Sequence, residues 1–315
     1  MNQREKPIKY SVVIPVFNSA AVVGETIDRT VALFEERGWA YELLLVNDGS
    51  GDRSWDLLRE KALSNPHIVA INLLRNYGQH TATFCGLRKS TGDYVITMDD
   101  DLQNPPEEMV HLIEKAHEDH DVVFGRYRQK QHAKYRRLGS FVIGMINRRI
   151  FHQSRGLVVS TFRIIRRDVV DRICSYNTAY PYISGLALMF SVSPANVWVE
   201  HRPRLVGEGH YNFSKLAELS RRILFNYSAF PLRLVSLVGM VISGLSFLLG
   251  TYYVGRAIFV GISVPGWTTV VVLLSFFNGV TILILSMLGE YTVRLLQQLN
   301  YANSYHVKEI IRSQA

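Results

Sequence analysis

Three consecutive carboxylates, Asp99, Asp100 and Asp101, follow an apolar run and precede the segment Gln103-Asn104-Pro105-Pro106. Carboxylate oxygens are the hard ligands that Mg²⁺ and Mn²⁺ prefer, and these ions commonly bridge carboxylates to substrate phosphates. Because carboxylates repel phosphate, a diphosphate bound here needs a bridging divalent cation. An isolated acidic turn is more often a solvated loop, but the strand pattern before it and the Pro-Pro turn after it favour a cation site.

Polar side chains also follow three other apolar runs. The three segments are Pro15-Val16-Phe17-Asn18, Asn47-Asp48-Gly49-Ser50 and Arg75-Asn76-Tyr77-Gly78-Gln79-His80. Open α/β sheets bind ligands at the carboxyl ends of their strands. If the four runs are parallel strands of one sheet, an aromatic ring, carboxylates, an arginine and amides meet at one edge.

Several other kinds of site lack their sequence pattern. No G-x-G-x-x-G or G-x-x-x-x-G-K-[ST] segment follows these runs, so a dinucleotide site or a P-loop loses its main support. Cys85 and Cys174 lie far apart without metal-ligand spacing, which fits a reducing compartment with neither disulfides nor zinc. A glycosidase would need paired carboxylates flanking a cleft without a metal, and the acidic triplet argues against it.

Alternating strand and helix patterns are expected to position these residues. The expected strands are Tyr10–Phe17, Tyr41–Asn47, His67–Leu73, Asp93–Met98 and Asp121–Gly125. The expected helices between them are Ala20–Arg37, Arg53–Leu63, Gln79–Lys89 and Pro106–His117. Strands that alternate with helices of this length imply βαβ units and a parallel sheet that is covered on both faces.

Two apolar runs without a formal charge, Leu234–Gly255 and Trp267–Leu288, are each long enough to cross a hydrocarbon core of about 30 Å. The connection Arg256–Gly266 joins them as a hairpin. A buried core helix is the alternative for either run, but two in tandem, each longer than a typical globular helix, favour membrane spans.

The basic residues around these runs predict their orientation. Arg221, Arg222 and Arg233 precede the first run and Arg294, Lys308 and Arg312 follow the second, whereas the connection holds only Arg256. Cytoplasmic flanks carry the excess of Lys and Arg. We therefore expect a multi-pass protein of the inner (plasma) membrane with its catalytic domain and both termini in the cytoplasm. The polar N-terminal segment also predicts that no signal peptide exports the first domain.

The chain is basic, with 35 Lys and Arg against 27 Asp and Glu and a formal net charge of +8. By itself this balance suits nucleic acid, anionic lipid or phosphorylated substrates equally. The segments Lys134–His152 and Phe213–Phe230 mix Arg and Lys with Leu, Ile and Phe, so each is either an interfacial helix or a surface helix with a basic face. Its place beside the hairpin favours the bilayer for the second segment, and we expect no nucleic-acid partner.

The motifs VVIPVFN, VNDGS, RNYGQH and DDDLQNPPE, followed by two apolar runs ending in LGEY, resemble the family 2 glycosyltransferases with a GT-A fold. More narrowly, the chain is similar to the polyprenyl-phosphate glycosyltransferases, a group that includes dolichol-phosphate mannose synthases and bacterial O-antigen and aminoarabinose lipid-carrier transferases. The resemblance covers nearly the whole chain. It implies a Rossmann-like, mostly parallel catalytic domain at 1–212, an amphipathic segment at 213–232, the hairpin at 233–289 and a cytosolic tail at 290–315.

The resemblance also implies an activity. It implies inverting transfer of a sugar from a UDP- or GDP-sugar to a polyprenyl phosphate of the undecaprenyl type, yielding a lipid-linked monosaccharide for envelope glycan modification. The implied cofactor is Mg²⁺ or Mn²⁺, and the implied assembly is a homo-oligomer. Two alternatives stay open. One is a catalytically inactive membrane scaffold that keeps the fold, and the other is a processive polysaccharide synthase, which usually carries a Q-x-x-R-W motif and more spans.

Site residues follow from the same resemblance. The donor-binding residues would be Pro15, Phe17, Asp48, Arg75, Asp99 and Asp100. The metal ligands would be Asp99, Asp101 and Gln103. The candidates for the acceptor phosphate are Arg126, Arg136, Arg137 and Arg163, because a guanidinium binds phosphate bidentately, although a surface or headgroup role is the alternative for each. Asp99, Asp101 and Arg163 would be catalytic.

The chain departs from the family pattern in three places. Leu157 and Val158 stand where relatives carry an Asp that is often proposed as a base, Gly209-His210-Tyr211 replaces Ser-Lys-Tyr, and Asn47-Asp48 replaces an acidic pair. A phosphate monoester has a second pKa of about 6, so the acceptor is already ionised at neutral pH. The sequence therefore favours a pre-ionised acceptor over an enzymatic general base.

Overall fold

A computed structural model of the chain describes residues 7–127 and 156–202 apart from 177 and 179, 266–299 and 305–313, with a few single residues at 148–154 and 227–259. The chain divides into two compact units. The first comprises Met1–Ser220 and Ala302–Ala315, and the second comprises Arg221–Tyr301. The second unit is therefore inserted, in sequence, between two parts of the first.

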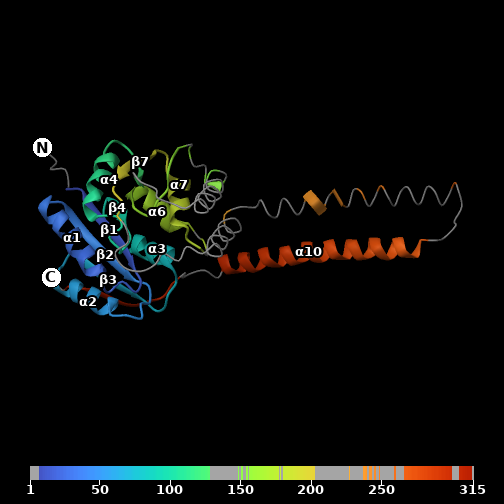
Figure 1. The fold of residues 1–315 in the computed structure, drawn as a ribbon, viewed down its shortest axis with the longest axis horizontal. Helices are drawn as coiled ribbons and strands as arrows, with labels where there is room; N and C mark the ends of the chain where they lie inside the picture. Colours follow the sequence, from blue (N-terminus) through green and yellow to red (C-terminus); the bar gives the residue numbers. More distant parts are fainter. Residues whose placement is uncertain are drawn as a thin grey trace. The chain divides into compact units, whose positions relative to one another are not determined.

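One sheet forms the centre of the first unit (Figure 1). Its described strands are β1 (Lys9–Val16), β2 (Ala40–Asn47), β3 (Ile68–Leu73), β4 (Tyr94–Thr97), β5 (Val122–Tyr127), β6 (Arg163–Arg166), β7 (Pro194–Val199) and β8 (Val307–Arg312). They are ordered β7-β5-β6-β4-β1-β2-β3-β8. The five strands that the sequence predicted are present as β1 to β5, whereas β6, β7 and β8 were not predicted.

The sheet is mixed, but six of its eight described strands run in one direction, in line with the predicted mostly parallel sheet. Strands β4, β1, β2 and β3 run parallel, as do β5 and β7. Strand β6 pairs antiparallel with both β4 and β5 and separates them, and β8 pairs antiparallel with β3. The sequence did not indicate β6 because Arg163–Arg166 has only four residues and an arginine at each end, too short for a periodic signal.

Helices cover both faces of this sheet (Figure 1). The described helices of the first unit are α1 (Val23–Glu36), α2 (Ser54–Ser64), α3 (Gln79–Lys89), the 3₁₀ turn η1 (Pro106–Glu108), α4 (Met109–Ala116), α6 (Arg167–Ser175) and α7 (Ile183–Phe190). The four helices predicted from the sequence correspond to α1, α2, α3 and η1 with α4. Their ends differ by a few residues at most, which is the usual uncertainty of helix boundaries.

Successive side chains of β1 point alternately to the two faces of the sheet and belong to two layers of the core. Tyr10, Val12 and Ile14 point to the face where α1, α2 and α4 pack, because successive strand residues face opposite sides. Val13 points to the other face, against α3. There a Cβ at Gly86 would lie 2.3 Å from Cγ1 of Val13, so α3 packs directly on the sheet. This close packing places Gln79, the first residue of α3, at the carboxyl end of the strands.

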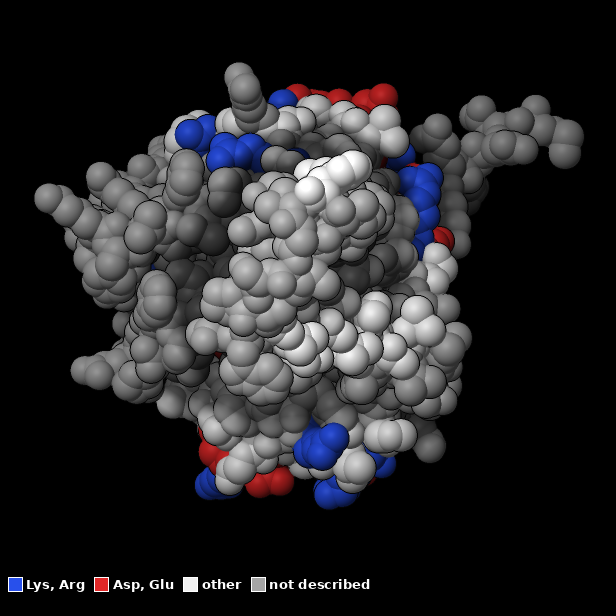
Figure 2. Space-filling model, turned by 90° about the vertical axis from the view of Figure 1, so that its right-hand side faces the viewer, with Lys and Arg blue, Asp and Glu red and all other residues white. Residues whose placement is uncertain are grey.

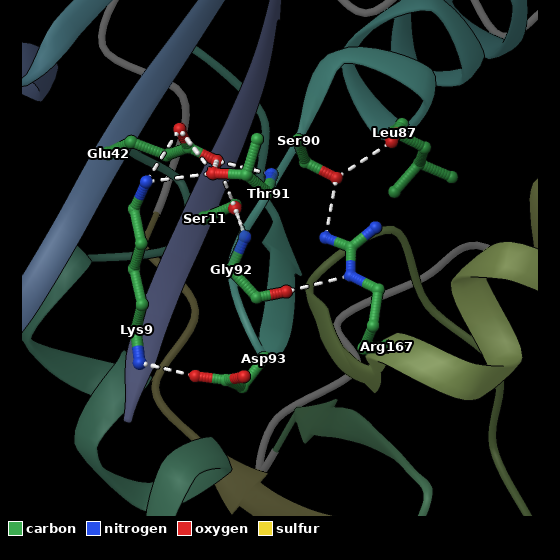
Figure 3. Close-up of polar contacts among 9 residues, drawn as sticks. All are labelled: Lys9, Ser11, Glu42, Leu87, Ser90, Thr91, Gly92, Asp93 and Arg167. Carbon is green, nitrogen blue, oxygen red and sulfur yellow. Dashed lines mark hydrogen bonds and ion pairs between the residues drawn. The ribbon is translucent and has the colours of Figure 1, made fainter. Parts of the chain in front are cut away.

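A polar network joins β1, β2 and the start of β4 at the opposite end of the strands (Figure 3). The Glu42 carboxylate accepts hydrogen bonds from Ser11 Oγ and Thr91 N, each 2.6 Å long, and pairs with Lys9 Nζ at 3.1 Å. Arg167 donates from Nε to the Gly92 carbonyl at 2.8 Å. The network joins the amino ends of the central strands. The predicted site residues lie at the opposite, carboxyl ends.

The second unit contains the helix α10 (Trp267–Leu299), which begins where the second apolar run was predicted to begin. Within the part of the chain that the structure describes, no helix is both long enough and apolar enough to cross a membrane. The first predicted run, Leu234–Gly255, lies mostly outside the described residues. The hairpin therefore stays a prediction.

The predicted basic segments Lys134–His152 and Phe213–Phe230 also lie almost wholly outside the described residues. Figure 2 shows one face of the molecule with charged side chains coloured, and the described Lys and Arg side chains lie there in separate groups.

Candidate active site

A cleft of about 290 Å³ opens at the carboxyl ends of β1, β2, β3 and β4. Each of these strands, or the loop that follows it, contributes to the wall. The lining residues are Pro15, Val16, Phe17, Ser19, Asp48, Asn76, Gly78, Gln79, Asp99, Asp100 and Asp101. Five of the six expected donor-binding residues, all except Arg75, thus line one cleft, together with Asp101, which was predicted as a metal ligand.

Asp48 shapes one wall of this cleft. Its side chain is buried, and its two oxygens accept hydrogen bonds from Tyr77 N at 2.7 Å and Gly78 N at 2.8 Å. Burial raises the pKa of Asp48, and these two backbone donors only partly offset that rise. The carboxylate therefore holds the chain that follows β3 against the end of β2.

The neighbouring Gly49 makes this approach possible. It adopts a φ of +67°, and a Cβ there would lie 2.5 Å from the carbonyl carbon of Arg75 and from Asn76 N. Glycine alone has both the conformational freedom and the missing side chain that the position requires. The Asp-Gly pair after β2 is thus a docking point for the backbone after β3.

Asp99 is held from two sides. Its Oδ1 accepts a 2.5 Å hydrogen bond from Gln79 Nε2, and its Oδ2 accepts a 2.8 Å hydrogen bond from Thr161 Oγ1. Gln79 opens α3, and Thr161 lies just before β6. Neither Gln79 nor Thr161 was predicted as a site residue, although Gln79 stands in the RNYGQH motif.

Burial and the neighbouring carboxylates shift the pKa of Asp100. Burial raises its pKa to about 6, with further contributions from the negative charges of Asp99 and Asp101, against the opposing effect of hydrogen bonds from Ser19 and Phe17 N. The triplet is therefore a concentration of negative charge in a partly dehydrated place.

The turn after the triplet is strained. Leu102 is buried with a φ of +56°, a left-handed conformation that costs a side-chain-bearing residue about 1–2 kcal/mol. Asp101 Oδ1 accepts a hydrogen bond from Gln103 N at 3.2 Å, and the Gln103 carbonyl accepts one from Arg202 N at 2.8 Å. Gln103, predicted as a metal ligand, is not among the residues that line the cleft.

The donor set of the triplet fits a divalent cation that shares its ligands with a substrate. Oxygen donors converge at the cleft, where burial, and after it the negative charges of Asp99 and Asp101, raise the pKa of Asp100. A bound dication would stabilise the ionised carboxylates against both effects. Among the described residues, no three His, Cys, Asp or Glu side chains are arranged as a complete metal site. Mg²⁺ commonly takes only one or two protein carboxylates and completes its shell with phosphate oxygens and water.

Arg163, predicted as a catalytic residue and a ligand of the acceptor phosphate, is buried and does not line the cleft. It is only 1% exposed, and its guanidinium donates to Thr97 Oγ1 at 3.1 Å and Ser184 Oγ at 2.7 Å. Burial lowers its pKa to about 10, so it stays charged at neutral pH. It borders a small cavity of about 10 Å³ that Asp99 also lines, roughly the space of one water molecule.

The other predicted arginines either do not line the cleft or lie outside the described residues. Arg126 lies over the Trp198 ring, with Cζ 4.4 Å from the ring centroid, and Arg75 lies over Tyr77 at 5.2 Å. Neither is among the cleft-lining residues. Arg136 and Arg137, like Gly209-His210-Tyr211, lie outside the described residues.

His80 was missed as part of the site. Its ring contacts Tyr180 and Tyr182, with centroids 5.8 Å and 5.4 Å apart. Burial, and to a lesser degree the charge of Arg163, lower its pKa to about 4. His80 is therefore a neutral ring at physiological pH that packs beside Arg163 and the small cavity.

The position of the absent Asp is taken up by backbone contacts. Val158 N donates to Asn196 Oδ1, and Asn196 Nδ2 donates to the Val158 carbonyl, both at 2.7 Å. This pair ties the segment before β6 to β7. Leu157 and Val158 supply no acid or base.

Comparison with known proteins gives matches over most of the chain. The model of the family described as "Glycosyl transferase family 2" matches residues 11–174. An undecaprenyl-phosphate 4-deoxy-4-formamido-L-arabinose transferase of Proteus mirabilis is 35% identical over 314 residues, covering 99% of this chain and 96% of that protein. A protein of the same name from Pectobacterium carotovorum is 36% identical over 305 residues, covering 96% and 93%.

Solved structures share the fold at lower identity. Glucosyl-3-phosphoglycerate synthase from Mycobacterium tuberculosis, in complex with Mn²⁺, UDP-glucose and phosphoglyceric acid, is 19% identical with a TM-score of 0.53, over 69% of this chain and 78% of that chain. Mannosyl-3-phosphoglycerate synthase from Rubrobacter xylanophilus is 18% identical with a TM-score of 0.50, over 69% and 72%. At these identities the likeness is one of fold.

Proposed function

Because this chain belongs to glycosyl transferase family 2, we propose that it transfers a sugar, with inversion, from a nucleoside-diphosphate sugar to a polyprenyl phosphate of the undecaprenyl type. The product is a lipid-linked monosaccharide. The observation that carries the proposal is the cleft at four strand ends, which is lined by the four carboxylates Asp48, Asp99, Asp100 and Asp101. The names and full-length similarity of the curated relatives support the acceptor class.

On the donor side, Pro15, Phe17 and Asp48 are proposed to bind the base and ribose of a UDP- or GDP-sugar. The rings and backbone at the end of β1 offer an apolar wall, and Phe17 is 47% exposed there. Asp99, Asp100 and Asp101 are proposed to face the diphosphate, with Asp99 and Asp101 as cation ligands. A bound Mg²⁺ or Mn²⁺ would neutralise the charge that develops on the leaving nucleoside diphosphate.

On the acceptor side, no side chain needs to remove a proton at neutral pH, because the phosphate monoester is already ionised. Arg163 is proposed to contribute through its positive charge behind Asp99, because its guanidinium is buried in hydrogen bonds to Thr97 and Ser184. Arg126, Arg136 and Arg137 stay candidates for direct contact with the phosphate, as their guanidinium groups suit bidentate binding.

We further propose that the runs Leu234–Gly255 and Trp267–Leu288 form a membrane hairpin, with the first unit on the cytoplasmic side. The support is the apolar length of both runs and the basic residues that flank them on one side. This arrangement would place the cleft where nucleotide sugars are available and near a lipid acceptor.

The decisive experiment is a screen of UDP- and GDP-sugars with undecaprenyl phosphate and Mn²⁺, using the full-length chain in lipid nanodiscs. The expected result is one nucleotide sugar that yields a lipid-linked monosaccharide, detected by mass spectrometry. A processive synthase would instead give a polymer. An inactive scaffold would give no product with any donor, and either result would overturn the proposal.

A further inference from the structure

Strand β6 brings a threonine hydroxyl to the first carboxylate of the acidic triplet. It pairs antiparallel with β4, with Arg163 opposite Thr97. Continuing this register past the paired ends of both strands sets Thr161 opposite Asp99. There Thr161 Oγ1 donates a 2.8 Å hydrogen bond to Asp99 Oδ2. The antiparallel insertion of β6 thus supplies Asp99 with a partner from 62 residues further along the chain.

The second oxygen of this carboxylate has a donor of its own. Gln79, at the start of α3, donates from Nε2 to Asp99 Oδ1 at 2.5 Å. Asp99 is only partly buried and lines the cleft, so water could solvate it without these two donors. Two donors from separate elements instead fix the rotation of the carboxylate. Because a carboxylate accepts about four such bonds, these two are compatible with a role as cation ligand.

Thr161 is itself held by hydrogen bonds that start at a buried positive charge. Arg163 Nε donates to Thr97 Oγ1 at 3.1 Å, and Thr97 Oγ1 donates to the Thr161 carbonyl at 2.6 Å. Arg163 also donates from Nη1 to Ser184 Oγ at 2.7 Å, which anchors the guanidinium. Hydrogen bonds that follow one another in the same direction polarise and strengthen one another. The buried charge of Arg163 therefore stabilises the backbone that presents the Thr161 hydroxyl.

We propose that Thr161 is a positioning residue for the divalent cation of the cleft and acts through Asp99. Its hydroxyl, with the side-chain amide of Gln79, holds the Asp99 carboxylate in the orientation in which it binds the cation. Arg163 and Thr97 in turn hold Thr161. The inference rests on the proposed function of the cleft as a cation-dependent nucleoside-diphosphate site. It also gives the buried Arg163 a role that needs no contact with a substrate phosphate.

Thr161 allows positioning to be separated from direct contact with the substrate. Gln79 lines the cleft and can touch a bound nucleotide sugar itself. Thr161 is not among the cleft-lining residues and borders the small cavity that Asp99 also lines. Valine has nearly the same shape as threonine, so its introduction removes the hydroxyl and little else. A loss of cation affinity on this change therefore reports the orientation of Asp99.

The test measures Mn²⁺ affinity on the full-length chain. Electron paramagnetic resonance of the free ion follows Mn²⁺ binding in excess UDP or GDP, whichever nucleotide the parent binds more tightly. Thr161→Val should weaken Mn²⁺ binding about 10- to 100-fold, because a side chain that binds a metal depends on the hydrogen bonds that orient it. Thr161→Ser keeps the hydroxyl and should bind Mn²⁺ almost as the parent does. Both melting temperatures should stay near that of the parent.

Two further variants separate the hydroxyl from general packing. Thr161→Ala also removes the hydroxyl and should weaken Mn²⁺ binding at least as much as Thr161→Val. Thr30→Val is the matched control, because Thr30 is a buried threonine of α1 whose hydroxyl donates to the Thr26 carbonyl at 2.7 Å. This control loses a hydrogen bond of the same kind and should keep the Mn²⁺ affinity of the parent.

Three results would overturn the inference, and they differ from failure of the proposed function. Parent-like Mn²⁺ affinity in both Thr161→Val and Thr161→Ala would show that the hydroxyl does not position Asp99. An equal loss in Thr161→Ser would show that the hydroxyl is not the cause, and an equal loss in Thr30→Val would show an effect of packing. A parent that binds no Mn²⁺ with either nucleotide would instead refute the proposed donor site, and this inference with it.

Discussion

At the scale of single residues, the acidic triplet and its turn are unfavourable for stability, which points to a chemical role. Three adjacent carboxylates in a partly buried cleft repel one another, and the pKa of Asp100 rises to about 6, chiefly through burial and then through this repulsion. The turn that presents them contains a buried leucine at positive φ. Stability alone would select neither feature, since each costs free energy, and such features concentrate at functional sites.

The first prediction concerns Asp101. Asp101→Asn keeps the size of the side chain and removes a proposed cation ligand, so transfer should fall about 100-fold or more. Asp56→Asn, on the exposed side of α2, is the control and should transfer sugar normally. Initial rates with and without EDTA provide the measurement. Full activity of Asp101→Asn, or of the parent in excess EDTA, would contradict a cation-bridged diphosphate.

The second prediction concerns the missing acid. If the acceptor phosphate is its own nucleophile, the acid limb of the pH–rate profile should follow its ionisation near pH 6. Leu157→Asp and Val158→Asp should then give little gain, because no proton needs removal and the new charge repels the phosphate. The profile is measured at saturating donor, with the parent and both variants. A large rate increase from either substitution would show that the acceptor needs a base.

At the scale of elements, the cleft depends on how closely the loop after β3, residues 74–78, approaches the turn after β2. A third prediction follows for Gly49→Ala. At φ +67° the new Cβ would lie 2.5 Å from the backbone of Arg75 and Asn76, so the loop must move. Nucleotide affinity should fall more than tenfold, beyond the conformational cost of about 1 kcal/mol for alanine at positive φ.

Gly38→Ala is the matched control for this prediction. Gly38 has nearly the same φ, +63°, but a Cβ there would meet no atom within 4 Å. Its melting temperature should fall slightly and its nucleotide affinity should not change. Calorimetric titration and thermal melting of both variants separate strain from displacement of the loop. Equal effects of the two substitutions would mean that the close approach has no functional role.

A fourth prediction concerns the polar network at the other end of the strands (Figure 3). Burial acts to raise the pKa of Glu42, but hydrogen bonds from Ser11 and Thr91 and the charge of Lys9 lower it below its ordinary value. A depressed carboxylate pKa stabilises the fold above the unfolded pKa, about 4.3, and this stabilisation is lost as the pH falls through the folded value.

Glu42→Gln should therefore lower the melting temperature at pH 7 and flatten its decline below pH 5. The charge-assisted hydrogen bonds lost are worth about 1.5–3 kcal/mol each at most. Glu36→Gln, at the exposed end of α1, provides the comparison and should keep the parental pH profile. Thermal melts that follow the unfolding of the first unit, from pH 3 to 8, measure both variants. An unchanged acid limb in Glu42→Gln would show that another group controls it.

At the scale of the whole molecule, the second unit is inserted in sequence between β7 and β8 of one sheet. Both chain ends therefore belong to the same unit. The fifth prediction is that tags at either terminus stay inaccessible from outside intact cells, whereas a tag inserted near Ser263 is accessible. Labelling with a membrane-impermeant reagent, before and after lysis, measures this. Labelling of the termini in intact cells would overturn the proposed topology.

The sequence by itself determined the five strands β1 to β5, the helices between them and the gathering of polar residues at their carboxyl ends. These features are local, because hydrophobic periodicity reports the burial of each segment and chain direction assigns the strand ends. Pro15, Phe17, Asp48 and the acidic triplet were found in this way. Gln79 and Thr161, which hold Asp99, were not, since their role depends on which side chains meet across the fold.

Only the tertiary structure decided how the sheet is completed. Strand β6 is four residues long, and β8 is an exposed edge strand, so neither carries a strong periodic signal. Their places come from backbone hydrogen bonds to segments far away in the chain, and no local pattern records such a choice of partner. The insertion of β6 between β4 and β5 buries Arg163 behind Asp99. The return of β8 to β3 places the backbone of His306 beside Leu74, because strands far apart in the sequence can pair in one sheet.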